Sequence, residues 1–141
     1  MEIKPLQEIT SLQEMFNFSA DHMLKQGKLS RGPKPPPSLH PLGSLSTGAP
    51  HLYRGLDSCK CTVGCFIPDE NYLPSFERLP INNPEIDKIL PTNIRSILGY
   101  QYFLEELQYA HDGSSYWGAI YRALTELALE FDLDPSILIG R

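Results

Sequence analysis

The side chains best suited to chemistry in this 141-residue chain gather between positions 51 and 72, where all three cysteines and one of the four histidines occur. Another histidine, His111, lies nearer the end of the chain. Thiolates and imidazoles are ligands that zinc prefers, and the same groups serve as nucleophile and base in cysteine-dependent hydrolases. The sequence therefore raises two kinds of site, a metal centre and a nucleophilic centre.

A zinc centre would need four ligands, and the candidates are His51, Cys61, Cys65 and His111, with Cys59 as a substitute. The spacing Cys59-x-Cys61-x-x-x-Cys65 differs from the paired C-x-x-C spacing of common zinc modules. Buried thiols that pack as small apolar side chains are the simpler interpretation. We therefore expect either no cofactor or a structural zinc ion.

A nucleophilic centre is the alternative, with Cys61 or Cys65 as the thiolate and His111 as the base of a small hydrolase or transferase. Asp112 is a poor third member, because it directly follows His111 and adjacent side chains usually project apart. No glycine-flanked nucleophile turn accompanies the cysteines. The favoured interpretation assigns no catalytic residue.

An anion-binding patch is a third interpretation, since the guanidinium of Arg54 lies among tyrosines in the sequence. Such a patch would make the protein a sponge for a small anionic nucleotide. A local ion pair between Arg54 and Asp57 explains this arginine more simply. The candidate binding residues, which include an acidic pair without calcium-loop spacing, are Tyr53, Arg54, Asp69, Glu70 and Tyr72.

The elements that position these residues begin with an amphipathic helix predicted over residues 11–26. Ser11 and Glu14 have the spacing of a capping box, and Gly27 suits the left-handed position that ends a helix. Residues 28–50 contain six prolines among glycines and serines. Because neither helix nor sheet propagates through such a segment, we expect a long internal loop or linker there.

Residues 51–67 predict a small β-hairpin with its turn near Gly55. Alternate side chains of a strand share one face, so the three cysteines are expected to point the same way. That face is expected to lie against the turn between the last two helices, which would bring His111 close to the thiols.

The C-terminal region predicts one helix over residues 92–110, with Gly99 as a point where it can bend or split, and another over 116–131. A short turn joins them, so they are expected to pack antiparallel as an αα-hairpin. The predicted fold class is therefore α+β. We expect a mainly helical single domain over residues 1–141, with the β-hairpin packed against the C-terminal αα-hairpin.

The net charge of −5 restricts the class of partner. A grip on nucleic acid or on an anionic membrane needs clustered lysine and arginine, so we expect neither as a partner. No apolar run approaches the roughly 18 residues that span a bilayer, and the N-terminus lacks the order of a signal peptide. We expect a cytoplasmic protein, and homo-oligomers are compatible with the sequence.

One motif runs from Tyr53 to Tyr72 and continues at residues 107–112; its residues are Tyr53, Arg54, Gly55, Lys60, Cys61, Val63, Gly64, Cys65, Ile67, Pro68, Asp69, Glu70, Tyr72, Leu107, Gln108, His111 and Asp112. With this motif the chain resembles a group of small phage and prophage proteins for which no activity is established. The resemblance covers about half of the chain and also includes an N-terminal helix. His51 departs from the group, which has cysteine there, and the proline-rich segment before it is unusually long.

The resemblance implies a phage or prophage origin, and hence the cytoplasm of a host cell. The exchange of cysteine for His51 suits a metal site, and it equally suits a structural position that accepts any medium side chain. Together with the small size and acidic charge, the resemblance favours a non-enzymatic accessory protein. We expect it to bind a host protein, for example as an inhibitor of a host defence system.

Overall fold

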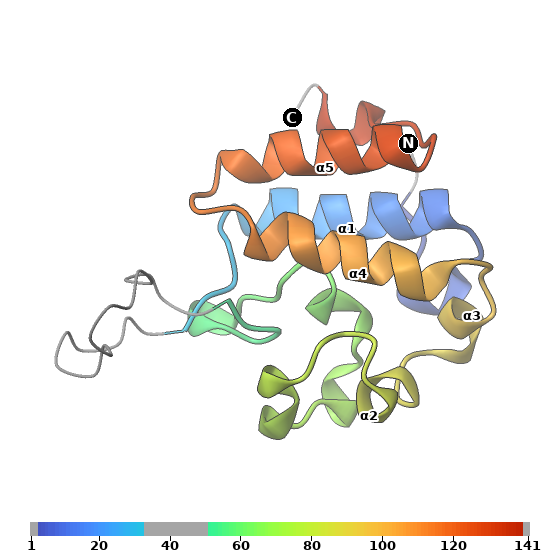
Figure 1. The fold of residues 1–141 in the computed structure, drawn as a ribbon, viewed down its shortest axis with the longest axis vertical. Helices are drawn as coiled ribbons and strands as arrows, with labels where there is room; N and C mark the ends of the chain where they lie inside the picture. The colour runs from blue at the N-terminus through green and yellow to red at the C-terminus, as the bar shows by residue number, and fades with distance from the viewer. Residues whose placement is uncertain (1–2, 33–50, 140–141) are drawn as a thin grey trace, which may run out of the picture.

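The computed structural model describes residues 3–32 and 51–139. Within them the chain is mainly helical, and one buried apolar cluster takes side chains from the three longest helices and from residues 61–67. Short 3-10 turns and loops make up most of the rest (Figure 1). The α-helices are α1 (Leu12–Gln26), α2 (Pro84–Asp87), α3 (Thr92–Arg95), α4 (Tyr100–Asp112) and α5 (Ala119–Glu130).

The predicted first helix is confirmed as α1. The Ser11 hydroxyl accepts a hydrogen bond from the amide of Glu14 at 3.1 Å, and Gly27 ends the helix with a φ of 73°. The Glu14 carboxylate accepts from the amide of Thr10 at 2.8 Å, one residue earlier than in a capping box. Its contact with Lys4, followed by the Thr10 amide, lowers the pKa of Glu14 to about 2.

The predicted β-hairpin over residues 51–67 is wrong, and with it the α+β class, because the described residues hold no strand or sheet. Two isolated bridges, Arg31 with His51 and Arg54 with Lys60, are the extended pairings found there. Every residue from 61 to 67 is buried, whereas a strand of a two-sided hairpin would alternate. The cysteines therefore do not share a strand face.

The close approach of two backbones explains why this segment turns instead of extending. A Cβ added at Gly64 would lie 2.5 Å from the carbonyl oxygen of Tyr53, so only glycine fits where the two backbones meet. From this point the chain forms the 3-10 turn η4 (Gly64–Phe66), which packs against α1. Local alternation of side chains did not reveal this crossing.

The predicted αα-hairpin is confirmed, since α4 and α5 pack together and run antiparallel (Figure 1). The helix predicted over residues 92–110 is split into α3 and α4 at Gly99, whose φ of 81° lies in the left-handed region. After α5, the chain folds back. The 3-10 turn η7 (Ser136–Leu138) packs against α1 and buries Ile137.

The loop predicted over residues 28–50 falls mostly outside the described residues, which resume at residue 51. Residues 28–32, the described part of that loop, form no helix. Among the described parts of the chain, none of the helices has the length and apolar content needed to cross a bilayer.

Candidate functional site

His111 is fully buried, and each of its ring nitrogens makes a hydrogen bond within the protein. Its Nε2 accepts a hydrogen bond from the amide of Ser30 at 2.9 Å, so the imidazole is neutral with its proton on Nδ1. Nδ1 donates to Asp112 Oδ1 at 3.1 Å, and the expectation that these adjacent side chains project apart is wrong. This imidazole holds the segment around Ser30 against the end of α4, and neither nitrogen is left to act as a base or ligand.

The three cysteines are free and buried, and two of the thiols are engaged locally. Cys61 Sγ accepts from the amide of Gly64 at 3.2 Å, while Cys65 Sγ donates to the carbonyl of Thr62 at 3.3 Å. Burial raises the pKa of Cys61 to about 12 and also raises that of Cys65. Because the thiolate is the reactive form, these thiols are poor nucleophiles near neutral pH.

The four predicted zinc ligands, His51, Cys61, Cys65 and His111, do not gather into one cluster. In residues 3–32 and 51–139, no group of three or more histidine, cysteine, aspartate or glutamate side chains is arranged to hold a metal ion. The thiols instead contact backbone groups within their own turn.

Thiol alkylation tests this description of the cysteines directly. In the folded protein at about pH 8, iodoacetamide is expected to modify Cys61 and Cys65 far more slowly than in the unfolded chain, because both are buried and protonated. Mass spectrometry after a timed pulse measures the extent at each site, and the urea-unfolded protein is the control. Rapid modification of either thiol in the folded protein would revive the nucleophilic interpretation.

Arg54 belongs to the network of hydrogen bonds that ties the motif side chains to the backbone, which we call the framework. Its guanidinium donates to the carbonyls of Gly64 and Ile67, each at 2.7 Å, and to Asp69 Oδ1 at 3.0 Å. It also stacks on the ring of Tyr72, 4.9 Å from the centroid. The expected pair of Arg54 with Asp57 is wrong, because Asp57 pairs with a lysine of the N-terminal segment instead.

Asp69 is shared between two cations. Lys60 Nζ lies 3.0 Å from its carboxylate, and this bond, ahead of the weaker influence of Arg54, lowers the pKa of Asp69. Of the predicted binding residues, Tyr53, Arg54, Asp69 and Tyr72 thus lie in one connected region, whereas Glu70 is exposed beside it.

Glu77 was missed as a central residue of this region. Its carboxylate accepts from the amides of Tyr53 at 2.8 Å and Arg54 at 3.0 Å, and from the Tyr72 hydroxyl at 2.5 Å. These partners are up to 24 residues away in sequence. No local pattern indicates such bonds, although a glutamate within a largely apolar loop passage is a weak signal.

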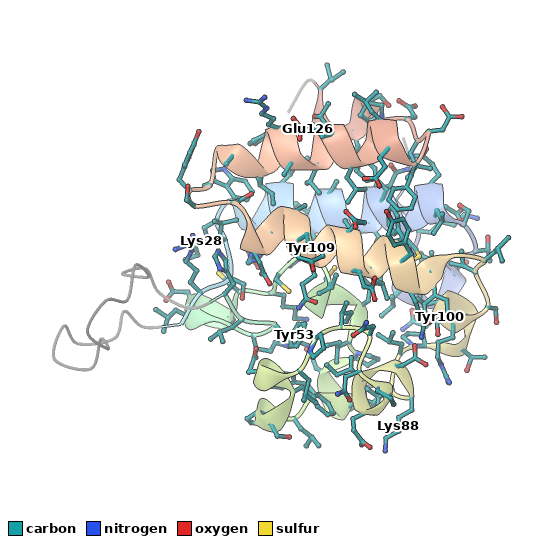
Figure 2. All side chains as sticks on the ribbon, viewed as in Figure 1. Lys28, Tyr53, Lys88, Tyr100, Tyr109 and Glu126 are labelled. Atoms are coloured by element: carbon teal, nitrogen blue, oxygen red, sulfur yellow. The ribbon has the colours of Figure 1, made fainter. Side chains whose placement is uncertain are left out.

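A cavity of about 490 Å³ opens beside this framework. It lies between the stretch from His51 to Tyr53, the stretch around Leu79 and one side of α4; Figure 2 labels Tyr53 and Tyr109 on two of these walls. Of the predicted site residues, His51, Tyr53 and Cys61 line it. The α4 residues were missed, although their helical spacing places them on one side: Glu105, Gln108, Tyr109 and Asp112.

The deeper polar groups of the cavity are paired with one another. The Tyr53 hydroxyl donates to the carbonyl of Leu79 at 2.5 Å and accepts from Gln108 Nε2 at 3.1 Å. Gln108 Oε1 in turn accepts from the amide of Ile81 at 3.1 Å. Burial raises the pKa of Tyr53 well above its usual range, so this hydroxyl stays protonated and structural.

The outer groups of the cavity retain open acceptor positions. One oxygen of Glu105 accepts from Asn82 Nδ2 at 2.6 Å, and one oxygen of Asp112 accepts from His111. Within the described residues, the second oxygen of each carboxylate has no partner. The cavity therefore presents acceptors, and no lysine or arginine lies among its described lining residues.

His51 adds a further acceptor to the cavity wall. Its Nε2 lies 3.3 Å from the carbonyl of Ser114, so Nε2 is the donor and Nδ1 carries a lone pair. The ring packs edge-on against His111, with centroids 5.2 Å apart. Burial, with a smaller contribution from the charge of Arg31, lowers the pKa of His51 below its usual 6.5, so the imidazole is neutral at pH 7.

Two partly buried histidines, His22 and His51, lead us to predict a loss of stability in mild acid. Burial lowers the pKa of His22 and of His51 from 6.5. A base with a lower pKa in the folded state costs nothing above its unfolded pKa and destabilises the fold as the pH falls below it. Urea unfolding at about pH 7.5 and about pH 5.5 is expected to show this loss, and His22→Gln should reduce it. A wild-type stability that is constant or rises over this interval would contradict the prediction.

Comparison of the chain with protein-family models, with curated proteins and with solved structures found no match.

Proposed function

We propose that this chain is a non-enzymatic, phage-type accessory protein that binds a basic host protein, for example a component of host defence, through the exposed side of α4. The observation that carries the proposal is the position of Tyr109, which is 71% exposed and lies between two hollows. It lines the 490 Å³ cavity on one side and a groove of about 230 Å³ between α4 and α5 on the other. We call this surface the Tyr109 ridge.

The groove beside the ridge combines an apolar floor with an acidic rim. Ala110, Ala123 and Leu127 supply apolar atoms. Burial and the nearby Glu130 and Glu105 raise the pKa of Glu106, which means that these carboxylates repel one another. A cationic partner would relieve that repulsion, while the apolar floor would add affinity. The rim consists of Glu106, Glu126 and Glu130.

The charge of the chain is concentrated in the same region. Residues 100–134 hold seven acidic side chains and one basic side chain, a net charge of −6, whereas the whole chain has −5. The single basic residue, Arg122, is already paired with Glu126 at 3.1 Å. Such a surface accelerates encounters with a basic partner and repels nucleic acid.

The alternative functions have less support from the geometry. A thiol hydrolase or transferase would need Cys61 or Cys65 as a thiolate, but burial holds both in the protonated form. A sponge for an anionic nucleotide would need a free cation, but the Arg54 guanidinium already donates to two carbonyls and to Asp69. The cavity, with its carboxylates, also disfavours an anion.

Affinity capture with a matched pair of tyrosine variants tests the proposal. The wild type is expected to retain a stoichiometric basic protein from host lysate, and calorimetry with the purified partner should show weaker binding as salt increases. Tyr109→Ala is expected to reduce the affinity by about thirtyfold, the scale of a central aromatic anchor. Tyr116→Ala is the control, since Tyr116 is 67% exposed and lines neither hollow.

Two results would overturn the proposal. One is the absence of any stoichiometric partner across several salt concentrations, and the other is equal loss of affinity in both tyrosine variants. If the capture retains only further copies of this chain, the partner is a second copy and the proposed host protein is ruled out.

A further inference from the structure

The two open carboxylates of the cavity are separated along one helix. Glu105 and Asp112 are seven residues apart, which is about two turns and roughly 10 Å along the axis of α4. Both line the cavity, and each has one oxygen that is unpaired within the described residues. A single small cation cannot contact both of them at once.

The wall between these carboxylates is mostly apolar or already paired. Leu52, Leu79 and Pro80 supply apolar surface. The hydroxyl of Tyr53 has both of its hydrogen bonds inside the framework, as described above. A ligand that satisfies the whole cavity thus needs an aliphatic middle and two separated groups that donate hydrogen bonds.

A neutral acceptor joins the carboxylate at one end. His51 Nδ1 has no partner within the described residues, and this imidazole lines the cavity together with Asp112. At the other end, the amide nitrogen of Asn82 is bound to Glu105, and its carbonyl oxygen has no partner among the residues that the structure describes. Each end therefore presents a carboxylate with a neutral acceptor, which suits an ammonium or guanidinium group.

From this arrangement we infer that the cavity binds a linear dication, meaning two positively charged groups joined by an aliphatic spacer. The volume of about 490 Å³ is within the usual range for small-ligand sites. The same chemistry has two sources, a free polyamine or two basic side chains of a bound protein. In the second case the inference rests on the proposed function, and it then specifies which residues the partner presents.

Titration of the full chain, observed through backbone amide NMR shifts, tests the inference. The probes are spermidine, a short peptide containing two lysines, and butylamine as a singly charged control. Spermidine or the peptide is expected to shift amides of residues 51–53 and 105–112 saturably, with at least about tenfold tighter binding than butylamine. Binding of spermidine identifies a polyamine site, and binding of the peptide alone identifies partner side chains.

Three variants that each remove one negative charge show whether the cavity is responsible. Glu105→Gln and Asp112→Asn are each expected to weaken binding at least about threefold, and Asp112→Asn keeps an oxygen that can accept from His111. Glu85→Gln is the control, because Glu85 is paired with Lys88 and lines neither the cavity nor the groove beside the Tyr109 ridge. Circular dichroism confirms that each variant is folded.

The inference is overturned if neither dication shifts these amides, if butylamine binds as well as spermidine, or if the control variant weakens binding as much as the cavity variants. Failure here is distinct from failure of the proposed function. If the cavity holds a free polyamine, Glu105→Gln and Asp112→Asn leave the capture of a partner unchanged, whereas if it holds side chains of the partner, both variants weaken that capture. Absence of any captured partner leaves the spermidine titration unaffected, since that titration needs no host protein.

Discussion

Gly64→Ala is expected to destabilise the protein by about 3 kcal/mol, because the new methyl group has no room. Its Cβ would lie 2.5 Å from the carbonyl oxygen of Tyr53 and 3.1 Å from the adjoining backbone carbons. Backbone atoms cannot move aside as a flexible side chain can. Any shift of Gly64 would also disturb the carbonyl that accepts from Arg54 at 2.7 Å. Urea unfolding monitored by circular dichroism measures the change.

Gly118→Ala is the matched control for this substitution. Its Cβ would approach only the ring of Tyr116, at 3.1 Å, and that exposed side chain can rotate away. Gly118 has a φ of −61°, which alanine adopts without strain. The control is expected to stay within about 0.5 kcal/mol of wild type. A Gly64→Ala protein as stable as the control would show that the two backbones do not cross as described.

Arg54→Lys is expected to cost about 3 kcal/mol, even though the charge is kept. The guanidinium reaches the carbonyls of Gly64 and Ile67 and the carboxylate of Asp69 simultaneously. A single ammonium group cannot reproduce this planar set of donors, so at least one of these acceptors loses its partner. The Arg54 side chain is only 16% exposed, which limits replacement by water. Thermal and urea unfolding both report the loss.

Arg122→Lys provides the comparison at an exposed position. The Arg122 side chain is 87% exposed and pairs with Glu126 one helical turn away, so its contribution is expected to be below about 0.5 kcal/mol. Equal effects of the two substitutions would mean that Arg54 is an ordinary surface residue and that the framework around it is misplaced.

The helices could be predicted from the sequence because their determinants are local. α1 begins with a bond from the Glu14 amide to Ser11 and ends at Gly27, and each of these residues lies within one turn of the helix end. The break at Gly99 was recognised as a weak point, although whether it would bend or split the helix depends on packing. Periodicity of apolar residues predicted helices in the C-terminal region, and the short turn between them predicted the pairing of α4 with α5.

The β-hairpin prediction failed because alternating small and apolar residues occur both in a strand and in a segment that is buried on all sides. Residues 61–67 alternate as a strand would, but all of them are buried, and the chain turns where Gly64 meets Tyr53. Gly64 and Tyr53 are far apart in the sequence, so alternation within residues 61–67 does not indicate their contact. A period of two therefore predicted the wrong local structure, since tertiary packing decided the outcome.

The candidate site was only partly predictable for the same reason. The bond between His111 and Ser30 spans 81 residues, and the bonds of Glu77 to the backbone near Tyr53 span up to 24. A single sequence contains no sign of such pairs. The residue types suggested reactive groups, but in the structure these side chains make hydrogen bonds within the protein. The surface that stays open to a partner lies on α4.

The central claim is that the side chains of the sequence motif build the framework, while the surface of α4 is left to bind. The protonation state of His111 tests it most directly, through the nitrogen-15 shifts of its imidazole measured with and without added zinc. We predict a protonated Nδ1 and an unprotonated Nε2 that stays hydrogen-bonded to the Ser30 amide, with no change on adding zinc. A protonated Nε2, or a shift of this nitrogen when zinc is added, would contradict the account.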